Sequence, residues 1–156
     1  MTLLIRLLFL SVFAVLTACQ SIDPDAPARA TRQQAITQEH SGNYFIGRRM
    51  YKTDYKMWGW IRKPGQQWNT AQLVMLNEHK CLAPDRQQNK LGSDHNYEYH
   101  LDGYFSGQQV YEPASDTFYP EFILLKATVL SKSPTNIYRY KEELDPKYRL
   151  LTPPLG

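Results

Sequence analysis

Hydrophobic residues follow two different patterns along the chain. Leu7–Leu16 is an apolar run that only Ser11 interrupts, whereas from Tyr44 onward hydrophobic residues recur mainly with a period of two. The two-residue period is typical of β-strands with one buried face. Residues 20–43, between these regions, contain no aromatic residue and are rich in Ala, Gln, Pro, Asp and Arg. The pattern predicts a leader, a polar linker and a β-rich domain.

The leader has the features of an export signal. Met1–Arg6 carries one positive charge and no acid, and Leu7–Leu16 follows it directly. That run is much shorter than the roughly 20 residues that a membrane-spanning helix needs. A short basic start, a short apolar stretch and small residues at its end indicate a segment that directs export and is then removed.

The end of the leader narrows this interpretation. Leu16-Thr17-Ala18-Cys19 resembles the lipobox of bacterial lipoproteins. The resemblance implies that residues 1–18 are removed as a lipoprotein signal peptide, that Cys19 receives a diacylglycerol group and that its new amino group is acylated. Gln20 in place of Asp implies the periplasmic face of the outer membrane in a Gram-negative host. The alternative is an ordinary secretory signal in which the cysteine is incidental.

The mature chain then divides into three parts. Residues 20–43 cannot bury enough apolar surface to offset the entropy lost on ordering, so residues 19–43 are predicted to be the lipidated N-terminus and a flexible tether. Ala30–Gln38 could form a short helix, but it has few apolar positions. Residues 44–150 are predicted to form the globular domain, and residues 151–156 a flexible tail.

The predicted domain is all-β and mainly antiparallel, with only one short helix expected, around Tyr140–Leu144. The predicted strands are Tyr51–Ile61, Ala71–Glu78, Tyr97–Phe105, Gln109–Glu112 and Phe122–Leu130. Their order and glycine placement resemble a small OB-type barrel, a fold that binds oligonucleotides and oligosaccharides on a strand face. A small β-sandwich is the alternative.

A group of tryptophans and basic residues is the first candidate site. Trp and Arg are over-represented at binding hot spots, because they bury much area and keep polar groups available. A protein or glycan partner is therefore predicted to contact this group, with the Tyr111–Pro120 loop as a second contact. The alternative is that the tryptophans pack in the core. The candidate residues are Trp58, Trp60, Arg62, Lys63, Trp68 and Tyr111.

Two groups of potential metal ligands are the second candidate. Glu98 and His100 would share one strand face, with His95 nearby, and His79 and Cys81 would share another. A solvated His–Glu pair and a buried lone cysteine are the alternative interpretations. With Cys19 lipidated, Cys81 is the only free thiol and could form an intermolecular disulfide in an oxidising compartment. No metal or other cofactor is predicted, apart from the lipid on Cys19.

Charge and motifs then limit the function. The formal charge is +3, or +2 once Arg6 is removed, and no Lys/Arg run is present, so a nucleic acid partner is not expected. No nucleotide-binding loop and no hydrolase or metalloprotease motif occurs. The sequence favours a non-enzymatic, lipid-anchored envelope protein that binds a protein or glycan. A metal-dependent protein and a purely structural accessory subunit remain alternatives.

Overall fold

The computed structural model describes residues 23–149 of the chain. The predicted signal peptide, the lipidation of Cys19 and the predicted tail at residues 151–156 lie outside this range. Within the described residues, no helix is both long enough and apolar enough to cross a membrane.

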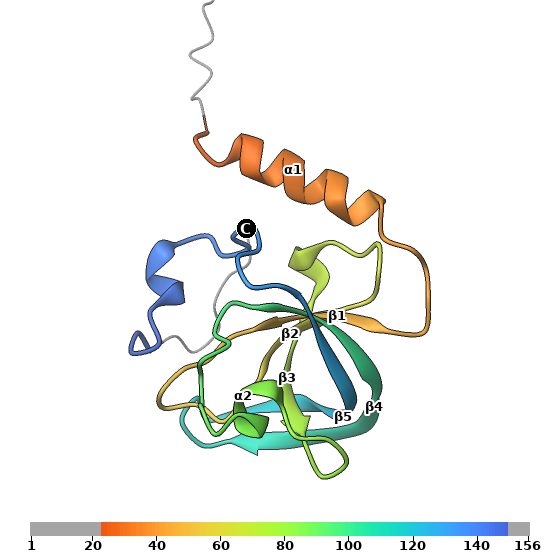
Figure 1. Cartoon of the computed structure of the whole chain (residues 1–156). Coiled ribbons are helices and arrows are strands. Elements are labelled where there is room, and N and C mark those ends of the chain that lie inside the picture. The colour runs from red at the N-terminus through yellow and green to blue at the C-terminus, as the bar shows by residue number, and fades with distance from the viewer. Residues whose placement is uncertain (1–22, 150–156) are drawn as a thin grey trace, which may run out of the picture.

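Five strands form a closed barrel in the order β1-β2-β3-β5-β4, with β4 pairing back to β1 (Figure 1). All neighbouring strands are antiparallel except β3 and β5, which are parallel. The predicted mainly antiparallel, OB-like barrel is therefore confirmed, and the sandwich alternative is wrong. The strands are β1 (Phe45–Arg49), β2 (Gly59–Arg62), β3 (Gln72–Asn77), β4 (Glu98–Glu112) and β5 (Thr117–Ser131).

The strand boundaries differ from the prediction mainly at the start of the barrel. The predicted strand Tyr51–Ile61 contributes only its end to β2, because residues 50–58 form the irregular connection from β1. β1 itself was not predicted. All five of its residues are buried, including Arg48 and Arg49, so it shows neither alternation nor a continuous apolar run. The predicted third and fourth strands are one continuous strand, β4.

The barrel interior is apolar and well covered. Strands β3, β4 and β5 contribute side chains that are completely enclosed, among them Val74, Leu101, Phe122 and Leu124. Three short helical turns lie between or after the strands: Trp68–Thr70, α2 (Pro84–Gln87) and Lys141–Leu144. The last of these agrees with the predicted short helix around Tyr140–Leu144.

The described part of the predicted tether is largely helical. α1 (Ala26–Thr37) lies across one end of the barrel (Figure 1). Ile36, near its C-terminal end, is only 3% exposed and belongs to a core cluster, while the rest of the helix is mostly exposed. The sequence did not indicate this docking, because a single buried residue in twelve leaves no detectable helical periodicity.

Candidate functional site

The three tryptophans of the predicted binding surface lie in the core. Trp58, Trp60 and Trp68 are 2%, 7% and 2% exposed. The interpretation that they form an exposed surface is wrong, and the structure shows the core-packing alternative. The physical reason is that both faces of this part of the barrel are covered: all four residues of β2, including Trp60, are buried, Trp60 and Trp68 pack in one core cluster and Trp58 packs in the other.

Arg62, one of the two cations of that predicted surface, is also buried and paired. Its guanidinium lies 4.5 Å from the centre of the Trp68 ring, and Nη1 donates a 2.7 Å hydrogen bond to Oε2 of Glu39. Glu39 follows α1, so this ion pair joins the helical segment to the barrel. Arg48 lies 5.2 Å from the same ring, and its Nη2 donates a 2.7 Å hydrogen bond to Glu98.

The side of the barrel beneath α1 is therefore charged and loosely filled. Arg32, Arg48, Arg62 and Trp68 line a cavity of about 260 Å³ there, together with Glu39, Glu98 and hydroxyl-bearing residues of the segment after β5. The Nε atoms of Arg48 and Arg62 are buried without a hydrogen-bond partner. Because both guanidiniums lie near the Trp68 ring, its π-face takes the place of an acceptor.

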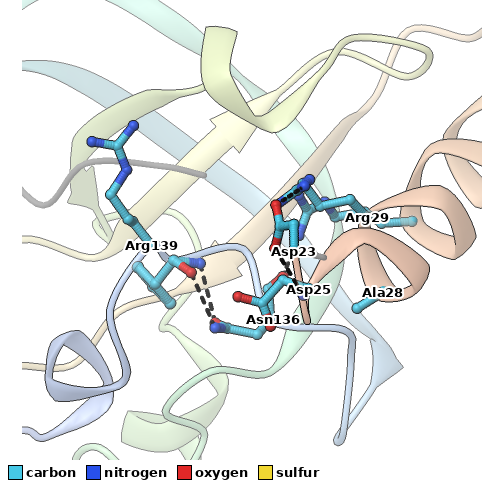
Figure 2. Close-up of a pocket in the computed structure, with 8 residues that line it drawn as sticks. Asp23, Asp25, Ala28, Arg29, Asn136 and Arg139 are labelled. Atoms are coloured by element: carbon cyan, nitrogen blue, oxygen red, sulfur yellow. Dashed lines mark hydrogen bonds and ion pairs between the residues drawn. The ribbon is translucent and has the colours of Figure 1, made fainter. Parts of the chain in front are cut away.

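A larger cavity, of about 500 Å³, lies between the start of α1 and residues 136–139 (Figure 2). Asp23, Asp25, Arg29, Arg32 and Arg139 give it charge of both signs. Asp23 forms an ion pair with Arg29, and Arg32 donates to the carbonyl of Asn136. Because Asp23 and Arg29 pair within the N-terminal segment and Arg32 reaches the Asn136 carbonyl on the other side, this hollow is a polar interface between α1 and the chain after β5.

Arg49, which follows Arg48 in β1, lies in a network of ion pairs and hydrogen bonds. Its Nη2 is 3.1 Å from Asp85 and its Nε is 3.3 Å from Asp94, and Nη1 donates to the carbonyls of Met57 and Trp58. The Tyr99 hydroxyl donates a 2.9 Å hydrogen bond to Asp94. Burial raises the pKa of Asp94, although the Arg49 guanidinium opposes that shift.

The predicted metal ligands make structural contacts with other residues and do not gather at one site. Glu98 pairs with Arg48, and His79 contacts Asn77. His100 packs against the Tyr44 ring, with a centroid separation of 4.3 Å. Among the described residues, no group of three or more His, Cys, Asp or Glu side chains is placed to hold a metal ion. Cys81 is half-buried and is a free thiol.

His95 is a structural histidine. Its Nδ1 accepts a 2.9 Å hydrogen bond from the Tyr51 amide, so Nδ1 carries no proton, and its Nε2 donates across 2.8 Å to the carbonyl of Leu144. Burial lowers the pKa of His95 below its usual value of 6.5. The neutral ring with its proton on Nε2 therefore links three segments of the chain.

Of the predicted binding surface, Lys63 is exposed, with its ammonium 3.7 Å from the centre of the Phe45 ring. Tyr111 is exposed as well. It lies near the tip of the β4–β5 hairpin, directly opposite Phe118, and the two ring centroids are 5.2 Å apart. The side chains are 46% and 61% exposed. We call these two residues the hairpin aromatic pair, and they form the candidate functional site.

The hairpin holds this pair in a defined position. The Tyr111 hydroxyl donates a 2.7 Å hydrogen bond to Asp116, whose backbone adopts a positive φ of 49° in the turn. On the other face, the buried carboxylate of Glu112 accepts hydrogen bonds from the Ser115 amide and hydroxyl, at 2.7 and 2.9 Å. Donation to the Asp116 carboxylate raises the pKa of Tyr111. Hydrogen bonds of the hairpin thus hold the two exposed rings in position.

Phe118 was missed in the sequence analysis because residues 111–120 were interpreted as a loop. A tight turn at Pro113–Asp116 would have placed Tyr111 and Phe118 at equal distances from the turn and hence opposite each other. Period-two alternation on both sides of the turn was the available signal.

Comparisons with protein-family models, with curated proteins and with solved structures find no match to this chain.

Proposed function

We propose that this chain is a lipid-anchored, non-enzymatic binding module of the bacterial envelope that recognises a protein or glycan partner through the hairpin aromatic pair. The observation that carries the proposal is the exposure of two aromatic rings, in tilted contact with each other, on a hydrogen-bonded hairpin. Aromatic side chains supply large contact area at low entropic cost, and exposed aromatic groups are otherwise unfavourable in water.

The proposed anchor is the lipidated Cys19. A diacylglycerol group together with an N-acyl chain gives durable attachment, whereas a single chain binds a membrane only marginally. Gln20 supports placement at the periplasmic face of the outer membrane in a Gram-negative host. α1, whose 12 residues span about 18 Å, stands between the anchor and the barrel.

The anchor is tested by labelling. In cells fed with radiolabelled palmitate, the natural chain should incorporate label and fractionate with membranes. Cys19→Ser should lose both properties, because the alkylated thiol is absent. Continued labelling of this variant would contradict lipidation at Cys19.

The binding site is tested with a double variant, Tyr111→Ser with Phe118→Ser. The matched control is Tyr140→Ser with Tyr148→Ser, which removes two rings that are 55% and 46% exposed elsewhere. Each full chain carries a photo-reactive amino acid at Gln109, on the same strand as Tyr111, and is crosslinked in intact cells. Binding of purified peptidoglycan is measured in parallel by co-sedimentation.

A protein partner should give one discrete adduct, and a glycan partner should give co-sedimentation without an adduct. Either signal should fall by at least about tenfold in the hairpin variant and remain in the control, as expected for a hot spot. Equal signals in the two double variants would exclude the hairpin aromatic pair as the site.

A further inference from the structure

Strand β5 has a free edge along its second half. β3 pairs with β5 only over Glu121–Ile123, whereas β4 pairs with it as far as Ser131. Within the described residues, no hydrogen bond is made to the backbone of residues 124–130 from the side that β3 has left. Backbone groups of every second residue in this stretch therefore face outward, as in an edge strand that can accept another strand.

At this edge, apolar residues on the inner face of the sheet are also incompletely covered. On β4, Tyr99 and Leu101 are 1% and 0% exposed, but Val129, directly opposite Tyr99, is 41% exposed. Ala127, opposite Leu101, is only half-buried. The apolar layer of the barrel thus continues to β5 and then ends at solvent.

Two irregularities add apolar surface to the same edge. The register between β4 and β5 shifts twice here, and Leu125 and Leu130 are the extra residues on β5. They are 46% and 52% exposed. Natural edge strands are commonly protected by proline or by several charges. Residues 124–131 contain no proline and only one charged residue, Lys126.

We infer that this edge, residues 124–131 of β5, binds an extended segment of another protein as an additional strand. The incoming strand places apolar side chains beside Ala127 and Val129, where they complete the inner layer. On the opposite face it places a carboxylate beside Lys126, which is exposed and lies across from Asp102. The expected sequence pattern is alternating apolar and polar residues with at least one Asp or Glu.

Charge and backbone chemistry exclude two other occupants, a second copy of this strand and the chain's own C-terminal segment. A second copy of this strand would bring Lys126 and Lys132 of each chain into one ribbon without any acid between residues 122 and 133. The chain's own C-terminal segment carries Pro153 and Pro154, which lack the N–H groups needed for pairing. It also follows Arg149, which contacts Ala114 at the hairpin end of β5. An acidic strand from another protein has neither the like charge of a second copy nor the prolines of the C-terminal segment.

The test uses the full chain in detergent micelles and a capped, fluorescently labelled peptide in which Val alternates with Thr and Glu. Alternate amides along one edge are N-methylated, so that the peptide cannot pair with itself. The control peptide has every amide N-methylated and therefore offers no edge. Binding is followed by fluorescence anisotropy, and its location by hydrogen–deuterium exchange.

The probe should bind at micromolar to millimolar concentration and slow exchange within residues 124–131. The control should bind at least about tenfold more weakly, because the backbone hydrogen bonds supply much of the affinity. Lys126→Glu should weaken binding about two- to fivefold and strengthen binding of a matching peptide with Lys in place of Glu. Lys147→Glu, a charge reversal at an exposed residue elsewhere, should change neither.

Three results would overturn the inference. One is the absence of protection at residues 124–131 with millimolar probe. A second is equal affinity for the two peptides. The third is protection of these residues by concentration-dependent dimers without peptide, which would identify a second copy as the occupant. Because the hairpin aromatic pair takes no part in this contact, the Tyr111 and Phe118 variants should bind the probe normally, whatever their effect on the proposed function.

Discussion

Arg48 and Arg49 are neighbours in β1, yet their surroundings on the two sides of the barrel wall differ sharply. Arg49 reaches two buried carboxylates and two carbonyls. Arg48 has one partly exposed carboxylate, the Asn96 side chain and one carbonyl as acceptors, but its buried Nε has none and a cavity lies beside it. The Arg49 side is an integral part of the domain, whereas the Arg48 side is an interface with α1, which has a single buried residue.

The difference indicates how burial of charge is tolerated in this protein. A buried ion pair is retained where all polar groups find partners, and removing one partner then leaves an uncompensated charge. A polar interface with cavities can separate at lower cost, because water can replace its hydrogen bonds. We therefore expect α1 to detach without unfolding of the barrel.

The largest expected effect is the loss of Asp85, which is completely buried. Asp85→Ala should lower the free energy of unfolding by about 3–5 kcal/mol, because Arg49 keeps its charge and loses a partner. Glu98→Ala, which removes the Arg48 partner at a site 21% exposed, should cost about 1–2 kcal/mol. Urea denaturation at pH 7 measures both changes in unfolding free energy. Equal losses in the two variants would contradict the proposed difference between the Arg49 side and the Arg48 side.

Loss of Glu39 should act on α1 rather than on the barrel. Glu39→Ala removes the ion pair with Arg62 and should cost about 1–2 kcal/mol of docking free energy. Amide exchange within residues 26–37 should therefore accelerate about tenfold, while exchange in β3 and β5 stays unchanged. Asp23→Ala, which breaks an exposed ion pair of α1, is the control and should leave barrel exchange and most of α1 exchange unaltered. Uniform acceleration in the Glu39 variant would show that α1 and the barrel unfold together.

The pH dependence of stability should identify the structural role of His95. Its pKa is lowered in the folded state, so the unfolded chain takes up the proton first as pH falls through 6.5. The contribution of this residue to stability should thus decrease between about pH 7 and pH 5. The raised pKa values of Asp94 and Glu143 act in the opposite direction, so the natural chain must be compared with His95→Gln. The variant's unfolding free energy should lack the His95 slope, and an identical slope in both would contradict the assignment.

The smallest effect on stability is expected at the hairpin aromatic pair. Phe118→Ser should change the free energy of unfolding by less than about 1 kcal/mol, because both rings remain largely exposed in the folded protein. Thermal unfolding should therefore be nearly unchanged in a variant whose partner binding is lost. A loss as large as that of Asp85→Ala would show that the pair belongs to the folded core instead.

The sequence predicted the β-rich domain and its barrel class because alternation survives in the first half of β4 and because β3 and β5 contain short apolar runs. It did not reveal β1, in which Arg48 and Arg49 are buried by partners that come from distant parts of the chain. For the same reason, the sequence left open whether the three tryptophans lie on the surface or in the core. Alternation assigns residues to two faces, but it does not say whether both faces are covered.

The sequence by itself predicted a division into a leader, a polar segment and a barrel-sized domain, since each prediction follows from the local spacing of apolar residues. It also determined the lipobox-like Leu16–Cys19 segment, which lies outside the described residues. The tertiary structure decided which aromatic rings are buried, which charges are paired and where β5 loses its neighbour. Those properties depend on contacts between segments far apart in the chain, and local spacing carries no information about such contacts.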